Sequence, residues 1–176
     1  MLLRSIVFQS VSTKAATTIH ARVVDTIRGR RQAPLAPERV LKCSKDKLRE
    51  AGLSWAKVEA MRDLARKTRD GIVPERDGLA GLSDREIIER IVQVRGIGQW
   101  TVEMLLIFSL GRPDVLPATD LGVRKGFARV YGLDEMPTPK ALLAYGERWA
   151  PYRSVASWYL WRSTELPEDI ILGMRD

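Results

Sequence analysis

Almost every segment of this chain spaces its apolar residues at intervals of three and four, the period of an α-helix, and no segment alternates convincingly as a half-buried strand does. Serines stand where such segments begin, at Ser12, Ser44, Ser54 and Ser83, and Glu86 follows Ser83 at capping-box spacing. Glycine and proline then interrupt the helical segments, as in "GRRQAPLAP". The pattern predicts an all-α protein of about eight to ten short helices.

The length and the charge of the chain limit what it can be. With 176 residues, 45% of them hydrophobic, it can bury a core as one domain or as two small lobes that share a cleft. Residues 1–88 carry 18 Lys and Arg against 11 Asp and Glu, whereas residues 89–176 carry 11 of each. This excess favours a polyanionic partner, although many basic proteins bind none.

One cysteine, Cys43, and one histidine, His20, leave little for metal or nucleophilic chemistry. They exclude a disulfide framework, a Cys-rich zinc site and an iron–sulfur cluster held by four cysteines, and we interpret both as structural. No apolar run is long enough to cross a membrane. The basic start of the chain continues at helical spacing, so we interpret it as folded structure and expect a cytoplasmic, nucleoid-associated protein.

The stretch "VRGIGQW" predicts a tight turn between two helices, the first of which ends near Val94. Gly96 and Gly98 allow a positive φ and a close approach of another backbone. The amides of the turn and of the following helix start suit a phosphate. The other interpretation is a helix C-cap at Gly96 and a packing glycine at position 98.

A lone carboxylate, Asp120, follows in "PATDLG" at the start of a further helix, where aspartate is a common N-cap. A carboxylate held by backbone amides is a poor general acid, but it suits the stabilisation of a cation. Trp100 and Met104 precede it on the second hairpin helix, four residues apart, and therefore share a face.

Four stretches, in order, resemble the signature of the helix-hairpin-helix (HhH-GPD) DNA glycosylase superfamily, and specifically its alkylpurine branch, 3-methyladenine DNA glycosylase II. They span nearly the whole chain and read "IVFQSVSTKAA", "GLSWAKVEAMRDLA", "VRGIGQWTVEMLLIFSLGRPDVLPATDLG" and "ERWAPYRSVASWYLWRS". The resemblance implies a single unit over residues 1–176 with a cleft between two helical lobes. One lobe would cover residues 12–112 with the hairpin at 84–110, and the other residues 113–176 together with residues 1–11.

The resemblance also implies a base-excision-repair enzyme that flips an alkylated purine out of double-stranded DNA. Asp120 matches the family's catalytic aspartate, which stabilises the developing charge on the sugar or activates water as the N-glycosidic bond is hydrolysed. Members that also cut the strand carry a lysine at the position of Trp100, and tryptophan cannot form a Schiff base. We therefore expect a monofunctional enzyme that requires no cofactor. Because no carboxylate precedes Gln9 and iron–sulfur cysteines are absent, adenine-mispair and thymine-glycol activities are disfavoured.

Several further residues take roles by resemblance. Trp100 offers an electron-rich face to a cationic base, and Trp161 matches a pocket tryptophan, with packing beside other tryptophans as its alternative. The resemblance also implies that the substrate is contacted by Met104, Gln9 and Phe8. DNA would be contacted by Arg95, Gly96, Gly98, Thr101 and Ser10. A structural monovalent cation would be held by the main-chain carbonyls of Val92, Val94 and Ile97.

The chain departs from the family pattern in four places. Arg95 replaces the usual hairpin proline, either as a phosphate contact or as a tolerated surface residue. Met104 replaces a pocket tyrosine of some members and makes a softer wall. Phe8 and Ser10 replace the usual residues of the segment that fills the gap left by the flipped base, so the residue that fills it stays open. Met1 lies close to that segment, as in a shortened member or a misassigned start.

We expect a monomer that binds damaged duplex DNA and does not bind membranes. The main alternative to a glycosylase is a non-catalytic helix-hairpin-helix module that binds DNA. A second alternative is a helical scaffold that binds another protein.

Overall fold

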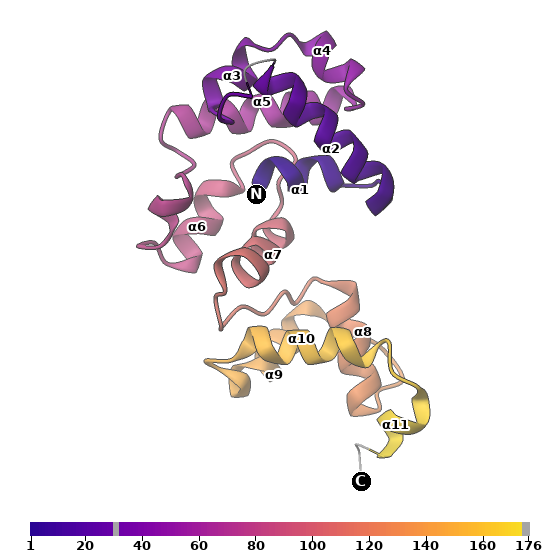
Figure 1. Ribbon diagram of the computed structural model, residues 1–176. Helices are drawn as coiled ribbons and strands as arrows, with labels where there is room; N and C mark the ends of the chain where they lie inside the picture. The colour runs from indigo at the N-terminus through magenta and orange to yellow at the C-terminus, as the bar shows by residue number, and fades with distance from the viewer. Residues whose placement is uncertain (30–31, 174–176) are drawn as a thin grey trace. The chain divides into compact units, whose positions relative to one another are not determined.

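The computed structural model describes residues 1–29 and 32–173, and all regular elements in these ranges are helices, as the sequence predicts (Figure 1). Clustering of contacts divides the chain into two units, residues 1–102 and 103–176. No helix among the described residues is both long enough and apolar enough to span a membrane.

The first unit contains six α-helices, one 3-10 turn and the start of a seventh α-helix. These elements are α1 (Leu2–Phe8), α2 (Thr13–Arg28), α3 (Pro37–Lys42), α4 (Lys45–Glu50), α5 (Trp55–Arg69), the 3-10 turn η1 (Arg76–Leu79), α6 (Asp84–Ile91) and the beginning of α7 (Gln99–Leu110). The second unit contains the rest of α7, then α8 (Leu121–Tyr131), α9 (Pro139–Gly146), the 3-10 turn η2 (Glu147–Trp149), α10 (Arg153–Ser163) and α11 (Glu168–Gly173).

Serine caps begin four helices of the first unit, and all four are the serines that the sequence predicts. The hydroxyls of Ser12, Ser44 and Ser54 each accept a hydrogen bond from the backbone amide three residues later. Ser83 and Glu86 form the expected capping box at the start of α6. Each cap satisfies a backbone amide that has no partner within its own helix, so these boundaries are set by local sequence.

Helix α5 is the centre of the first unit, because α1, α3 and α4 all pack against it (Figure 1). The core around it consists of aliphatic side chains from five helices and the adjoining loops, including Val7, Val23, Ile27, Val40, Leu48, Leu53, Val58 and Met61. The apolar face of α2 points into this core through Val23 and Ile27, as the spacing predicts.

The two units differ from the expected lobes at both ends of the first lobe. Residues 1–11 group with the first unit instead of with residues 113–176, because Ile6 and Val7 of α1 are fully buried there. The division falls inside α7, after Val102, and residues 103–112 therefore belong to the second unit.

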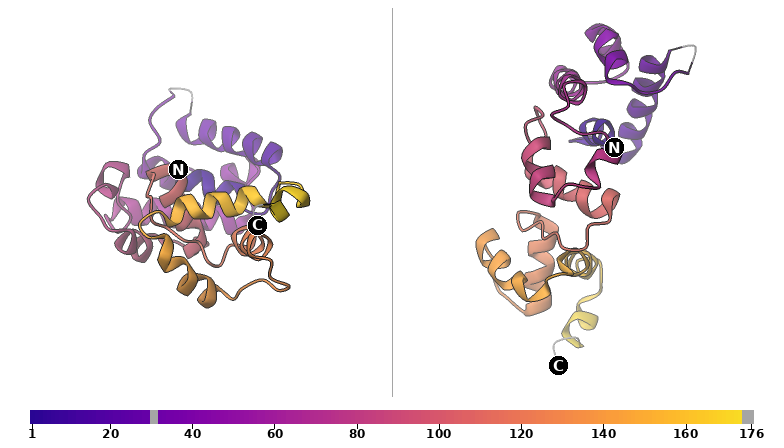
Figure 2. Two further views of the ribbon diagram at one scale, coloured as in Figure 1. Left: turned by 90° about the horizontal axis from the view of Figure 1, so that it is seen from below. Right: turned by 90° about the vertical axis from the view of Figure 1, so that its left-hand side faces the viewer.

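In the second unit α8 packs on α10 more extensively than on any other helix (Figure 2). Their backbones approach at Gly126, where a Cβ atom would lie only 1.9 Å from the carbonyl oxygen of Leu160. Around this crossing lies a core that includes Leu116, Ala118, Val123, Phe127, Leu142 and Leu160. Glycine at position 126 is therefore a packing requirement.

The start of α10 is fixed to the loop after α7 by an ion pair. The guanidinium of Arg153 donates to both carboxylate oxygens of Asp114, from Nε at 2.7 Å and from Nη2 at 2.8 Å. The backbone amide of Val115 donates to the hydroxyl of Ser154 at 2.9 Å, which adds a second tie. Hydrogen bonding to Arg153 lowers the pKa of Asp114 from its ordinary value of 3.8.

Replacing Gly126 by alanine should destabilise the protein by about 1 to 3 kcal/mol, because the new methyl group forces α8 and α10 apart. Alanine normally stabilises a helix relative to glycine, so a decrease in the free energy of unfolding would indicate the steric clash between α8 and α10. Urea unfolding measures the effect, with Lys125→Ala at the exposed neighbouring position as control. A stabilised Gly126→Ala variant would contradict the close helix crossing.

The Asp114–Arg153 pair should stabilise the protein in a pH-dependent way. The folded-state pKa of Asp114 lies below the unfolded value, so the contribution is fully present above about pH 4 and is lost as the pH falls through the folded-state pKa. The difference in unfolding free energy between wild type and Asp114→Asn should thus be constant from about pH 5 to 7 and shrink towards pH 3. If the difference in unfolding free energy at about pH 3 equals that at about pH 7, the pair does not stabilise the protein in a pH-dependent way.

Candidate functional site

A tight turn joins α6 to α7, as the glycine pattern predicts. The amide of Val94 donates to the carbonyl of Ile91, and the amide of Ile97 to the carbonyl of Val94, each at 3.0 Å. Gly96 has a φ of 77°, in the left-handed region that glycine tolerates best. Gly98 lacks the positive φ that we allowed for, and a Cβ there would meet open space. Neither the backbone nor the packing of this chain requires glycine at position 98.

The side chains around this turn differ in exposure. Arg95 is exposed, and Trp100 is 47% exposed at the start of α7. Thr101, in contrast, is buried, with its amide donating to the carbonyl of Gly98 at 3.0 Å. The exposed side chains of the turn and of the start of α7 are therefore Val92, Gln93, Arg95, Gln99 and Trp100.

The turn is held against α5 by Asp63, a residue that the sequence did not single out. One carboxylate oxygen, Oδ2, accepts the backbone amide of Arg95 at 2.9 Å and the ammonium of Lys67 at 2.6 Å. Burial opposes ionisation of Asp63, but hydrogen bonds from Lys67 and from the amide of Arg95 outweigh it and lower its pKa. A charged acceptor thus fixes the backbone of the turn.

The segment after α1 lies beside the same turn. The side-chain amide of Gln9 donates to the carbonyl of Gly96 at 2.9 Å. Ser10 is exposed and adopts a φ of 54°, which is rare outside glycine. Phe8 packs against the core of the first unit, with Arg4 over its ring at 4.1 Å. Of these three residues, only Ser10 is fully on the surface.

In the second unit Asp120 caps α8, as predicted, and also binds Trp161. Its Oδ1 atom accepts the amide of Val123 at 2.8 Å and the indole Nε1–H of Trp161 at 2.7 Å. Trp161 thus contacts the carboxylate directly. This contact is additional to packing beside other tryptophans, which was the alternative interpretation. Two donors on one oxygen hold the carboxylate in a single orientation and stabilise negative charge.

Two further residues shape the surroundings of Trp161. Gly122 makes room for the indole, because a Cβ there would lie 2.8 Å from its Cδ1 atom and 3.1 Å from Oδ1 of Asp120. Phe108 of α7 lies against the indole with 5.5 Å between ring centroids and is 61% exposed. Met104, one turn earlier on α7, is half-buried. Phe108 continues the four-residue spacing of Trp100 and Met104, a signal that could have revealed it.

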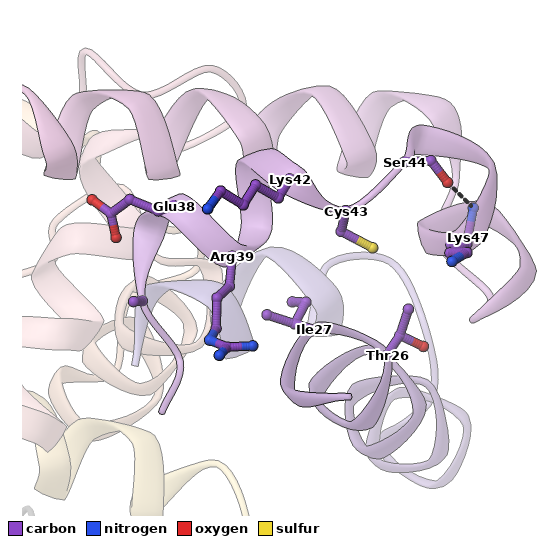
Figure 3. A pocket seen from close by; sticks show the side chains of 9 residues that line it. Thr26, Ile27, Glu38, Arg39, Lys42, Cys43, Ser44 and Lys47 are labelled. Atoms are coloured by element: carbon purple, nitrogen blue, oxygen red, sulfur yellow. Dashed lines mark hydrogen bonds between the residues drawn. The ribbon is translucent and has the colours of Figure 1, made fainter. Parts of the chain in front are cut away.

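A cavity of about 680 Å³ in the first unit is lined by residues of α2, α3 and α4 and of the adjoining loops (Figure 3). Cys43 lines it together with Arg39, Lys42 and Lys47, and no residue of the predicted site does so. Burial raises the pKa of the Cys43 thiol and so disfavours the reactive thiolate. Burial and the nearby Arg4 lower the pKa of His20. Both residues therefore fit the structural interpretation.

The described residues contain no group of three or more His, Cys, Asp or Glu side chains arranged to hold a metal ion. The carbonyls of Val92, Val94 and Ile97 lie within or beside the turn between α6 and α7. The carbonyl of Val94 accepts one hydrogen bond from Ile97, and a carbonyl oxygen has two lone pairs. Carbonyl oxygens in such a turn fit the chemistry of a hard monovalent cation.

The chain belongs to the HhH-GPD superfamily of base excision DNA repair proteins, whose family model matches residues 3–151. It is 39% identical to DNA-3-methyladenine glycosylase 1 of Schizosaccharomyces pombe over 167 residues, which cover 95% of this chain and 72% of that protein.

Two solved structures have the same fold. The S. pombe 3-methyladenine DNA glycosylase Mag1 in complex with abasic DNA matches with a TM-score of 0.78 and 37% identity, over 95% of this chain and 80% of that one. A DNA-3-methyladenine glycosidase from Bacillus halodurans matches with a TM-score of 0.82 and 40% identity, over 92% and 73%. These matches confirm the resemblance inferred from the sequence motifs.

Replacing Gly122 by alanine should break the Trp161–Asp120 hydrogen bond, because the methyl group occupies the space of the indole. The indole N–H resonance of Trp161, assigned by its absence from Trp161→Phe, should exchange with solvent about 10-fold faster or more in Gly122→Ala. Leu121→Ala, at an exposed neighbouring position, should leave the exchange unchanged. Equal exchange in Gly122→Ala and wild type would contradict this geometry.

Proposed function

We propose that this protein is a monofunctional DNA glycosylase of base excision repair, which removes alkylated purines of the 3-methyladenine type from double-stranded DNA. The observation that carries the proposal is the carboxylate of Asp120, held by the amide of Val123 and the indole of Trp161 in a chain of the HhH-GPD superfamily. Relatives named 3-methyladenine glycosylases, one of them in complex with abasic DNA, support the substrate class.

In the proposed reaction the bond between C1′ of the deoxyribose and the purine nitrogen breaks, and its electron pair leaves with the base. The sugar becomes an oxocarbenium-like cation, which the carboxylate of Asp120 stabilises electrostatically. Water then bonds to C1′ and loses a proton, either to this carboxylate or to solvent. Alkylation of a ring nitrogen gives the purine a positive charge, so it leaves without protonation by a general acid.

Aromatic side chains beside Asp120 and at the start of α7 would favour a cationic base. The ring pair of Phe108 and Trp161 lies next to Asp120, and Trp100 is exposed at the start of α7. Such faces attract cations through their ring quadrupoles. Trp100 has no amine for a Schiff base, which is why the proposed enzyme releases the base without cutting the strand.

The turn between α6 and α7 would bind the DNA backbone through its amides, at a place where Gly98 leaves space for close approach. The carbonyls of Val92, Val94 and Ile97 would hold a monovalent cation, which stiffens the turn and adds positive charge near a phosphate. No cofactor takes part in the proposed reaction. Because the proposed substrate is duplex DNA, we also propose a cytoplasmic, nucleoid-associated location, and we propose that the protein is a monomer.

The variant Asp120→Asn tests the catalytic role. Asparagine is as good an N-cap as aspartate, so the fold should persist while the charge is lost. Single-turnover release of base from duplex DNA containing 3-methyladenine or hypoxanthine should fall by about 100-fold or more, with DNA affinity within about 2-fold of wild type. If wild type and Asp120→Asn release base equally slowly, the protein is a non-catalytic DNA-binding module.

Gly98→Val serves as the complementary variant, because its side chain enters the space proposed for a phosphate. It should weaken binding to damaged and undamaged duplexes alike, by about 10-fold, and the wild-type affinity should fall with increasing salt. Salt-independent or undetectable DNA binding by the wild type would favour a scaffold that binds another protein.

A further inference from the structure

Two backbone segments of the first unit, far apart in sequence, are joined by side-chain hydrogen bonds. The first is the turn of residues 8–11, which runs from the last residue of α1 to the residue before the N-cap of α2, and the second is the turn of residues 92–98 between α6 and α7. The Gln9 side chain bridges them by donating to the carbonyl of Gly96 at 2.9 Å. A glutamine engaged in this way is directed towards the protein backbone.

Lys57 of α5 fixes the end of α1 that carries Gln9. Its Nζ atom donates to the carbonyl of Val7 at 2.8 Å and to the carbonyl of Gln9 at 2.6 Å. Lys57 is partly buried, and desolvation lowers its pKa. Burying this charge costs free energy, which its two carbonyl partners offset. Carbonyls at a helix C-terminus are good partners for a cation.

The same helix holds the second turn. Ala60, three residues after Lys57 on α5, lies close to Gly96. Asp63, six residues after Lys57, accepts a hydrogen bond from the backbone amide of Arg95. Residues three apart are neighbours on a helix surface, so Ala60 lies next to both Lys57 and Asp63. Helix α5 therefore contacts both turns, and Gln9 ties them to each other.

Between these ties lies Ser10, exposed and in the left-handed region with a φ of 54°. A non-glycine residue keeps such a conformation only when its surroundings impose it. Here the Lys57 ammonium and Gln9 hold the chain before Ser10, and Ser12 caps α2 directly after it. The turn is therefore presented to solvent in one fixed shape.

We propose that Lys57 is a positioning residue, which through Gln9 makes the turn of residues 8–11 and the turn of residues 92–98 one rigid surface for damaged DNA. The inference rests on the proposed function, and it assigns Gln9 to bracing the two turns instead of contacting the base. A rigid surface loses less conformational entropy on binding than two loose turns do. The benefit would fall on DNA with a displaced or missing base and not on phosphate contacts in general, because the family resemblance implies that part of this segment fills the gap in the double helix.

The experiment compares the affinity of the full chain for two duplexes, one intact and one with an abasic-site analogue, by fluorescence anisotropy at one salt concentration. The abasic duplex also carries 2-aminopurine opposite the analogue. The fluorescence of 2-aminopurine changes when a protein segment enters the gap left by the missing base. The variants are Lys57→Met and Gln9→Ala, with Lys57→Arg as the conservative replacement. Lys140→Met, at an exposed position of α9, is the matched control for loss of one charge.

Lys57→Met and Gln9→Ala should each reduce the preference for the abasic duplex by about 10-fold and diminish the 2-aminopurine change, with affinity for intact duplex within about 2-fold of wild type. Lys57→Arg should restore most of the preference, since a guanidinium can also donate to two carbonyls. Lys140→Met should behave like wild type. Circular dichroism and urea unfolding identify any variant that has merely lost its fold.

The inference is overturned if Lys57→Met stays folded and keeps both the preference and the fluorescence change. It is also overturned if both affinities fall in parallel, since that result assigns Lys57 to general phosphate binding. If only Gln9→Ala loses the abasic preference, Gln9 contacts DNA directly and Lys57 has no positioning role. Wild type that prefers the abasic duplex but releases no base would refute the proposed glycosylase while leaving the positioning role intact.

Discussion

The close crossing of α8 and α10 is the contact on which the geometry around Asp120 depends. At Gly126 the helices approach so nearly that no Cβ atom fits against the carbonyl of Leu160, and one turn earlier Gly122 leaves the space that the indole of Trp161 occupies. Two glycines on one face of α8 thus set both the distance between the helices and the hydrogen bond to the carboxylate. Since a backbone carbonyl cannot rotate away as a side chain can, the crossing tolerates little variation.

The contacts that fix Asp120 also suit it to the proposed chemistry. As the N-cap of α8 it accepts a backbone amide, and Trp161 adds a second donor, so the structural role and the proposed catalytic role rest on the same hydrogen bonds. A carboxylate held in this way stabilises a nearby cation without having to reorganise during the reaction. A cationic alkylated base leaves readily, so one fixed charge is sufficient for base release.

Helix α5 has the corresponding role in the first unit, where two of its charged side chains bind the backbone of neighbouring segments. Lys57 binds two carbonyls at the end of α1, and Asp63 binds an amide of the turn between α6 and α7. Backbone amides in such turns can bind phosphates without reading base sequence. That property suits a protein that must find a damaged base in any sequence context.

The sequence by itself determined the helical class, the serine caps, the glycine turn after α6 and the N-cap at Asp120, because each depends on residues within about one helical turn. Ordered motifs also gave the superfamily. Only the tertiary structure decided that Trp161 donates to Asp120 across 41 residues and that Gln9 reaches Gly96 across 87. It also placed residues 1–11 on α5 and left Gly98 without a positive φ. These outcomes depend on which helices pack together, and apolar periodicity shows which face of a helix is buried but not what buries it.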